Sequence, residues 1–239
     1  MGVSVSHVIP LACALAAGAV RAEDATQVYL SDKQLTYVGP LDEDANRKLF
    51  DLYDSLADKP AELSIRSTGG EVNAGMALGR WVHAHHLNVK VLEYCLSACA
   101  NYVFPAGAHK TVSNFAMIGF HGGGGSEHAA LSEETLQQFD RMSAQERAAF
   151  VADLQAMDER NTLDEDAYFR EIGVRQDLST LGQEPRYQDL RERASNSVGW
   201  TYTLENFHRL GIDNIKVINP PWKPLSPIKG AKFLLLPLE

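Results

Sequence analysis

The amino-acid sequence predicts an α/β protein with a mostly parallel sheet and a helical arm. Its 239 residues are 45% hydrophobic and 22% charged, the composition of a folded protein of one domain. Short runs rich in β-branched and aromatic residues alternate with segments whose apolar residues recur at helical spacing. Such alternation of strands and helices is typical of parallel sheets. The formal net charge of -9 argues against nucleic acid or an anionic membrane surface as a partner.

The chain begins with a segment that we interpret as a signal peptide over residues 1–22. Residues 8–20 form an apolar run that is shorter than the roughly 20 residues of a membrane-spanning helix. Val20 and Ala22 suit the outer positions of a leader-peptidase site, so we expect cleavage after Ala22. The mature protein is therefore expected to be periplasmic or secreted and to lack a membrane span.

The first half of the mature chain predicts a strand pair followed by alternating helices and strands. Residues 27–37 suit a strand pair at the edge of a sheet, ended by Gly39-Pro40. The elements expected next are a helix capped by Asp42 and closed by Lys59-Pro60, a strand over 62–66, a helix over 72–86, a strand over 88–94, a buried helix over 98–104 and one or two strands over 110–120.

The second half predicts a helical arm and a return to the sheet. Residues 126–161 suit an arm or lid, with a capping box from Ser143 to Glu146, although an ordinary helix packed on the core fits the same pattern. Residues 164–195 are charged and aperiodic. A helix over 203–210 and a strand over 212–218 complete a domain that spans 23–219, and the proline-rich residues 220–239 are expected to form an extended tail.

Three fragments carry the chemistry: Ser67-Thr-Gly-Gly-Glu-Val72, Cys95-Leu-Ser-Ala-Cys99 and Ile118-Gly-Phe-His121. Each follows or ends a predicted strand, and the carboxyl ends of parallel strands share one edge of a sheet. The two glycines would present unpaired backbone N–H groups, Ser97 a hydroxyl and His121 an imidazole. Together they would supply donors, a nucleophile and a base.

Each fragment also has a plain structural explanation. Gly69-Gly70 suits a tight turn, Ser97 a helix cap, and a single histidine at a strand end a structural residue. Cys95 and Cys99 could form a disulfide in an oxidising compartment or remain two small buried thiols, and both alternatives stay open. The pair lacks the further ligands of a metal site, so no metal is expected.

The order and spacing of these motifs resemble the Clp-type serine protease and crotonase superfamily, and especially exported Clp-protease-like proteins of bacteria. The similar segments are Ser67-Thr-Gly-Gly before a helix, Ser97-Ala in a small-residue helix that ends in Phe104-Pro-Ala-Gly107, and a strand closing on Gly-Phe-His121. The resemblance covers about residues 34–125, and the helix near 203–211 resembles a later segment of the family.

The resemblance implies a spiral of strand-strand-helix (ββα) turns with a serine nucleophile and a histidine base. Carried over by motif, the nucleophile falls on Ser97, the base on His121, and the amides of an oxyanion hole on Gly70 and Ala98. The chemistry is coherent, because serine needs a neighbouring imidazole to take its proton and the tetrahedral oxyanion needs fixed donors.

One departure from the family pattern concerns the group that orients the histidine. Family proteases carry an aspartate where this chain reads Ser195-Asn-Ser-Val-Gly-Trp200. Asn196 could accept the imidazole N–H through its side-chain oxygen, and the acids Asp177, Asp189 and Glu192 are alternatives.

These observations predict an exported, cofactor-free serine peptidase that acts on peptides or proteins and assembles as a homo-oligomer. A peptide-binding module with weak or no catalysis on the same scaffold is the first alternative. A crotonase-type acyl-CoA enzyme is the second, which export disfavours because that cofactor is intracellular.

Overall fold

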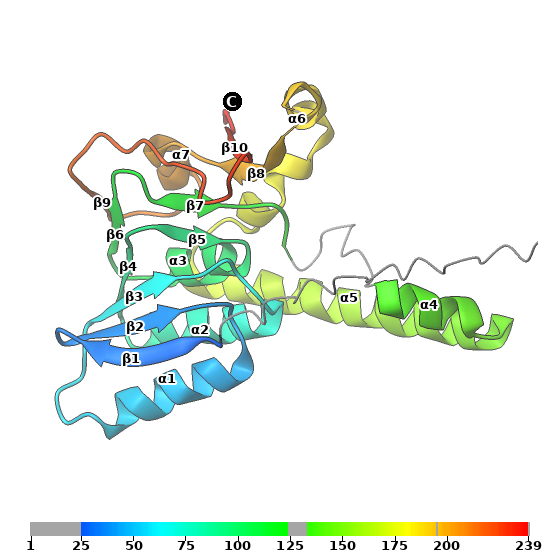
Figure 1. Cartoon of the computed structure of the whole chain (residues 1–239), viewed down its shortest axis with the longest axis horizontal. Coiled ribbons are helices and arrows are strands. Elements are labelled where there is room, and N and C mark those ends of the chain that lie inside the picture. The colour runs from blue at the N-terminus through cyan, green and yellow to red at the C-terminus, as the bar shows by residue number, and fades with distance from the viewer. Residues whose placement is uncertain (1–24, 124–132, 195, 239) are drawn as a thin grey trace, which may run out of the picture.

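The structure is a computed structural model that describes residues 25–123, 133–194 and 196–238 (Figure 1). The expected signal peptide and its cleavage site lie outside the described residues. The strands are β1 (Gln27–Ser31), β2 (Gln34–Val38), β3 (Glu62–Arg66), β4 (Asn88–Val91), β5 (Tyr94–Leu96), β6 (Lys110–Ser113), β7 (Met117–Gly119), β8 (Ser197–Thr201), β9 (Ile215–Ile218) and β10 (Lys232–Leu235). The helices are α1 (Glu43–Ser55), α2 (Val72–Ala84), α3 (Phe104–Ala106), α4 (Glu133–Arg141), α5 (Ala144–Ile172), α6 (Gln188–Arg193) and α7 (Leu204–Arg209).

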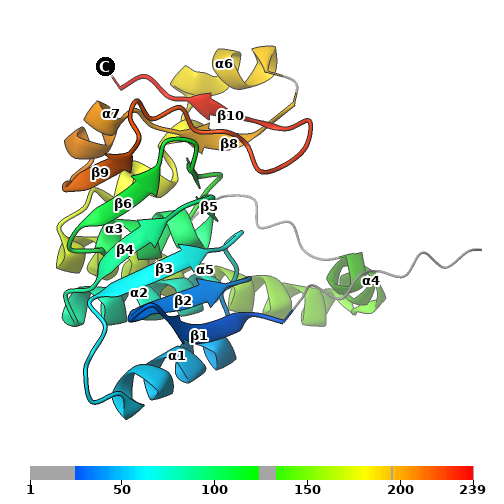
Figure 2. The same ribbon diagram turned by 60° about the vertical axis from the view of Figure 1, so that its left-hand side comes forward.

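The larger sheet has six strands in the order β1-β2-β3-β4-β6-β9 (Figure 2). Only β1 and β2 pair antiparallel, as a hairpin at the sheet edge; the other neighbours run parallel. The chain is therefore a mixed α/β protein with a mostly parallel sheet, as the alternation of strand and helix patterns predicts.

One face of this sheet packs against the helices. Alternate strand residues such as Leu63, Ile65 and Val89 are buried, because successive side chains of a strand point to opposite faces. Asp42 caps helix α1, since its side chain accepts from the N–H of Ala45. Both α1 and α2 lie along this face (Figure 2). The expected cap and the expected strand over 62–66 are confirmed.

A second, smaller set of strands lies beyond the carboxyl ends of β3, β4 and β6. Ser67 continues β3 into a parallel bridge with Cys95 of β5, β5 pairs with β7, and Phe120 bridges to Trp200 of β8. The expectation of one strand over 88–94 is wrong, because the chain leaves the large sheet after β4 and begins β5 in this second set. The site motifs all lie on it.

Part of the expected C-terminal tail belongs to the same set of strands. Strand β10 pairs parallel with β8, and Leu236 is buried in the core. The backbone N–H of Lys232 donates to the carbonyl of Asn196 at 3.0 Å. This strand is not evident from the proline-rich sequence, because its four residues are ordered by pairing with β8, which is distant in the sequence.

The expected buried helix over 98–104 is a π-helical segment, Cys99–Val103, that continues into α3. All five of its residues are buried, and α2 packs directly on it. A Cβ added at Gly79 of α2 would lie 2.5 Å from the carbonyl oxygen of Tyr102, so only glycine permits this close approach. Small residues in both elements therefore position the segment that follows Ser97.

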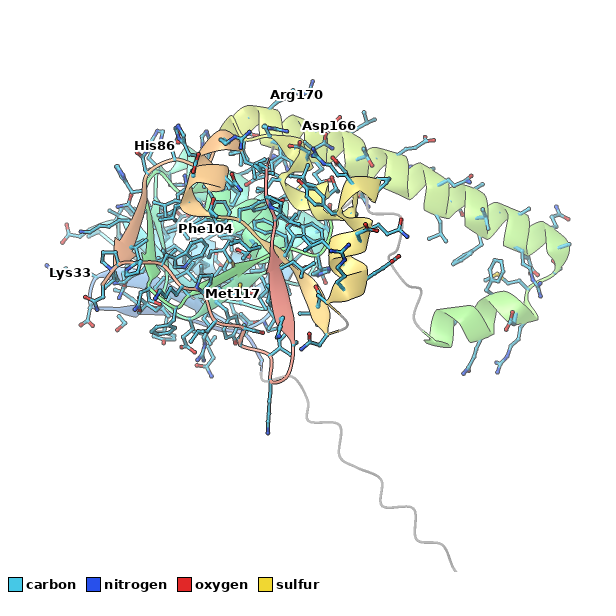
Figure 3. The ribbon with its side chains drawn as sticks, turned by 90° about the horizontal axis from the view of Figure 1, so that it is seen from above. Lys33, His86, Phe104, Met117, Asp166 and Arg170 are labelled. Carbon is cyan, nitrogen blue, oxygen red and sulfur yellow. A yellow bond between two sulfur atoms is a disulfide. The ribbon has the colours of Figure 1, made fainter. Side chains whose placement is uncertain are left out.

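Helices α4 and α5 form a hairpin that projects from the body (Figures 1 and 3). Helix α5 begins with the expected capping box between Ser143 and Glu146, and the rings of Phe139 and Phe150 pack with centroids 5.7 Å apart. The C-terminal part of α5 buries Tyr168 and Phe169 in the core. The N-terminal part of α5 therefore belongs to a projecting arm, and its C-terminal part packs on the core as an ordinary helix does. Within the described ranges, we find no helix long and apolar enough to cross a bilayer.

Candidate active site

Ser97 occupies a sharp turn between β5 and the π-helical segment. Its φ is +53°, a left-handed conformation that is uncommon for a residue other than glycine. Its N–H donates to the carbonyl of Gly119 at 2.8 Å, and its own carbonyl accepts from the N–H of Asn101 at 2.8 Å. A serine on a strained strand-to-helix turn is the geometry that exposes nucleophilic serines in hydrolases. Among the described residues, its hydroxyl forms no hydrogen bond.

The Gly69-Gly70 turn lies directly against this serine. A Cβ at Gly69 would lie 2.6 Å from the Cβ of Ser97, and one at Gly70 would lie 2.2 Å from the carbonyl oxygen of Leu41. The φ values of +98° and +150° also exclude most side chains. Glycine is required at both positions by backbone conformation and by contact, which explains the motif better than a plain tight turn.

Two backbone N–H groups close to the Ser97 turn have no partner in the described chain. The bridge with Leu41 uses the carbonyl of Gly69 and the N–H of Glu71, and it leaves the N–H of Gly70 unused within the described chain. Ala98 stands at the start of the following helical turn, where N–H groups have no intrahelical partner. These two amides are the donors that the sequence motif indicates.

A disulfide between Cys95 and Cys99 spans the turn. Both cysteines are fully buried, one in β5 and the other in the first turn of the π-helical segment. Of the two states that the sequence left open, the structure has the disulfide. It covalently joins the chain two residues before Ser97 to the chain two residues after it.

His121 leaves the strand next to that of Ser97. Leu96 and Gly119 are register partners in the parallel pair β5 and β7, so Ser97 and His121 both follow the carboxyl ends of adjacent strands. His121 is exposed, and its carbonyl accepts from Nε2 of Gln183 at 3.1 Å. The hydrogen bonds of the described residues do not include one between the imidazole and Ser97. Such bonds are often long without substrate and shorten in the reactive complex.

The loop after His121 packs against the buried carboxylate of Glu165, which was not predicted from the sequence. Glu165 of α5 is 1% exposed, and Tyr102 donates its hydroxyl to Oε1 at 2.7 Å. A Cβ at Gly123 would lie 2.6 Å from the same oxygen, so the loop rests on this carboxylate. The signal was available, because Glu165 lies at helical spacing from the buried Tyr168 and Phe169.

A second hydrogen bond fixes the same loop from the other side. Nδ2 of Asn101 donates to the carbonyl of Gly122 at 2.7 Å, and Asn101 is itself only 2% exposed. Oδ1 of Asn101 is buried and has no hydrogen-bond partner among the described residues. Since Asn101 follows Ser97 by one helical turn, it links the serine turn to the histidine loop.

Tyr202 and Trp200 form the apolar support behind β8. Burial raises the pKa of Tyr202, so its phenol stays neutral and donates to the carbonyl of Leu178 at 2.8 Å. Its oxygen accepts from the indole N–H of Trp200 at 2.9 Å. Because Trp200 bridges Phe120, this network fixes the strand end that carries His121.

Among the described residues, the candidate orienting groups form no hydrogen bond or ion pair with His121. Nδ2 of Asn196 donates to the carbonyl of Gly230 at 2.9 Å and so joins the loops beside β8 and β10. The three acids have other partners: Arg175 for Asp177, Arg193 at 3.9 Å for Asp189, and Gln188 for Glu192. The structure thus brings together Ser97, Gly70, Ala98 and the strand end of His121, and it leaves Asn196 apart from them in hydrogen bonding. No cluster of His, Cys, Asp and Glu that could hold a metal occurs in the described ranges.

No model of a known protein family matches the chain, and no curated protein matches it. Among solved structures it is similar to an enoyl-CoA hydratase from Thermoplasma volcanium GSS1, with a TM-score of 0.29 and 8% sequence identity. The similar region covers 38% of this chain and 49% of that protein, about half its length. The class of the protein therefore rests on its own architecture, a mixed α/β fold with a mostly parallel sheet, and its activity on the site described above.

The disulfide generates a prediction about stability and site geometry. Replacing both cysteines by alanine (Cys95→Ala with Cys99→Ala) should lower the free energy of unfolding by about 2 kcal/mol, because the short loop closed by the bond gains freedom when unfolded. Urea denaturation of the double variant and the parent measures this. Peptide mapping without reductant should recover the Cys95–Cys99 pair, and two alkylatable thiols in the unfolded, unreduced chain would contradict the assignment.

Proposed function

We propose that this protein is an exported serine hydrolase that cleaves peptide amides through an acyl-enzyme on Ser97. The observation that carries the proposal is the left-handed turn at Ser97, which packs against the Gly69-Gly70 turn and leaves the N–H groups of Gly70 and Ala98 without a partner in the described chain. His121 at the end of the adjacent parallel strand supports it. The resemblance of the same motifs to Clp-type proteases agrees with this chemistry.

In the proposed reaction, Oγ of Ser97 attacks the substrate carbonyl while the imidazole of His121 takes the hydroxyl proton. The amides of Gly70 and Ala98 donate to the resulting oxyanion, and loss of one such donor typically costs about 2.7 to 4 kcal/mol of transition-state stabilisation. His121 then gives its proton to the leaving amine as the tetrahedral intermediate collapses to an ester. Water, deprotonated by His121, hydrolyses that ester and restores Ser97.

The group that orients His121 sets the expected rate. Asn196 stays the candidate, through its side-chain oxygen, because only its nitrogen is used by Gly230. No carboxylate of the described chain hydrogen-bonds to the imidazole, so the described residues do not give the imidazolium formed during attack the stabilisation that a triad aspartate supplies. A slow peptidase fits this arrangement.

The lack of a carboxylate hydrogen-bonded to His121 among the described residues also favours a second candidate function, a peptide-binding module. In that case the amides of Gly70 and Ala98 would hold an extended peptide without bond cleavage, and Ser97→Ala would leave binding unchanged. A loss of cellular function in Ser97→Ala would count against this candidate.

Within the mixed α/β class, we propose a more specific fold, the spiral of ββα turns. In its support, β4 and β5 are consecutive strands that enter the large and the small set in turn, and β6 and β7 repeat this pattern. The Gly69-Gly70 turn before α2 and the Ser97 turn before the π-helical segment occupy equivalent places in successive units. The spiral would explain why three remote motifs meet.

A fluorophosphonate probe tests the hydrolase proposal directly. The mature chain should be labelled at Ser97, Ser97→Ala should abolish labelling, and His121→Ala should slow it by about 10²- to 10⁴-fold because the general base is lost. Mass spectrometry of the tryptic peptides locates and times the adduct.

Two matched controls accompany the labelling experiment. Ser55→Ala removes an exposed hydroxyl at the end of α1, and His109→Ala removes an exposed imidazole before β6. Both should leave labelling unchanged. A folded parent protein that forms no Ser97 adduct would refute the hydrolase.

We further propose that the arm mediates self-association, the role that such an arm has in the resembled family. Val151 of the arm is 41% exposed, and Leu163, just beyond the arm in α5, is 66% exposed. The arm lies away from the body (Figure 3). The pair Val151→Asp and Leu163→Asp should shift the protein toward monomer in analytical ultracentrifugation. Leu225→Asp, at a leucine that is also 66% exposed but lies near the C-terminus, should not. A parent protein that sediments as a monomer across micromolar concentrations would overturn this proposal.

A further inference from the structure

A hollow of about 260 Å³ opens beside His121. It lies toward β8 and β10, whereas Ser97 follows β5 on the other side of β7. Its walls come from His121, the 3-10 turn Leu181–Gln183, α6, β8 and β10. Its lining includes His121, Gln183, Arg191, Ser197, Trp200 and Leu234. The hollow shares one residue, His121, with the proposed active site.

Arg191 of α6 brings a positive charge to this hollow. Its Nη1 donates to the backbone carbonyls of Gly182 and Glu184, so the guanidinium is held in place by neutral acceptors. No ion pair to Arg191 occurs among the described residues. Its neighbours Arg186 and Arg193 differ, because they pair with Glu184 at 2.7 Å and Asp189 at 3.9 Å.

The remaining polar groups of the hollow are already engaged with backbone. Nε2 of Gln183 donates to the carbonyl of His121, and the hydroxyl of Ser197 donates to the carbonyl of Gly199 at 3.2 Å. Trp200 and Leu234 contribute apolar wall. None of the described residues that line the hollow is a carboxylate, although the full sequence has 31 acidic against 22 basic residues. The described lining of the hollow therefore supplies no negative charge to complement Arg191.

The place of the hollow relative to His121 indicates what would fill it. In serine hydrolases the imidazole takes the serine proton and gives it to the leaving amine, so the leaving part of the substrate lies on the imidazole side. A carboxylate there would meet a planar guanidinium whose Nε and Nη2 are not used by the backbone carbonyls. Apolar walls reduce screening by water and strengthen such a contact.

We propose that this hollow is a substrate subsite for a carboxylate on the leaving-group side, with Arg191 as the residue that determines specificity. The inference rests on the proposed hydrolase function and narrows its substrates to acidic peptides. Two sources offer the same chemistry: an Asp or Glu side chain, and the free C-terminus of a short peptide.

Binding to the full-length mature Ser97→Ala protein tests the subsite without requiring turnover. The probes are N-terminally fluorescein-labelled hexa-alanine amides that carry Glu or Gln at each position in turn, and hexa-alanine with a free C-terminal carboxylate. At the preferred position, Glu should bind about 10- to 100-fold more tightly than Gln, the range expected for a hydrogen bond to a charged group. If the C-terminus is the natural occupant, the free-acid peptide should show the gain instead.

Variants at α6 assign the preference to Arg191. Arg191→Gln should remove the difference between Glu and Gln peptides, whereas Arg191→Lys should keep only part of it, because the charge remains but the paired N–H groups of the guanidinium are lost. Arg193→Gln, a matched change at an arginine outside the hollow, should have no effect. Since a structural defect would weaken Glu and Gln peptides alike, the ratio of the two dissociation constants separates specificity from folding.

Three outcomes would overturn the subsite: equal binding of the Glu, Gln and free-acid peptides, a preference that survives in folded Arg191→Gln, or no peptide binding up to millimolar concentration. These outcomes are distinct from failure of the hydrolase. A protein that prefers acidic peptides but never reacts with a fluorophosphonate retains the subsite and loses the catalysis. One that reacts at Ser97 without such preference retains the catalysis and loses the subsite.

Discussion

The left-handed backbone at Ser97 is the constraint on which the candidate site depends. A serine with a φ of +53° turns the chain from β5 into a helical segment within one residue and leaves its side chain at the strand end. The contact at Gly69, where a Cβ would lie 2.6 Å from that of Ser97, and the Cys95–Cys99 disulfide hold this turn. Conformations of this kind cost of order 1 to 3 kcal/mol and persist only where the surroundings enforce them.

The second set of strands then brings the other groups to the same place. Ser67, β5 and β7 lie side by side, so the glycine turn, the serine turn and the histidine loop all follow parallel strand ends. Buried polar contacts from Glu165 and Asn101 support the loop after His121. The hollow with Arg191 extends the site along β8, so that the proposed chemistry and the proposed specificity share one histidine.

Local patterns predicted most elements, and tertiary contacts decided the rest. The cap at Asp42, strand β3 and the capping box at Ser143 follow from residues close in sequence, and each is found where expected. The break between β4 and β5 was not predictable, because only Leu92 and Glu93 separate the two strands and no glycine or proline marks the turn. Strand β10 forms only by pairing with β8. The charged stretch near Glu165 gave no helical pattern, although it forms the last turns of a long helix whose buried face includes that carboxylate. Motif order predicted Ser97, Gly70, Ala98 and His121 as a group, whereas Asn196 depended on a segment whose hydrogen bonds are long-range.

A crystal structure of the protein phosphonylated at Ser97 measures the central geometry most directly. The account predicts that the phosphonyl oxygen accepts from the N–H groups of Gly70 and Ala98 at about 2.7 to 3.1 Å. It also predicts a ring nitrogen of His121 within about 3.2 Å of Oγ of Ser97. A phosphonyl oxygen turned away from both amides, with the imidazole on another face of the molecule, would contradict it.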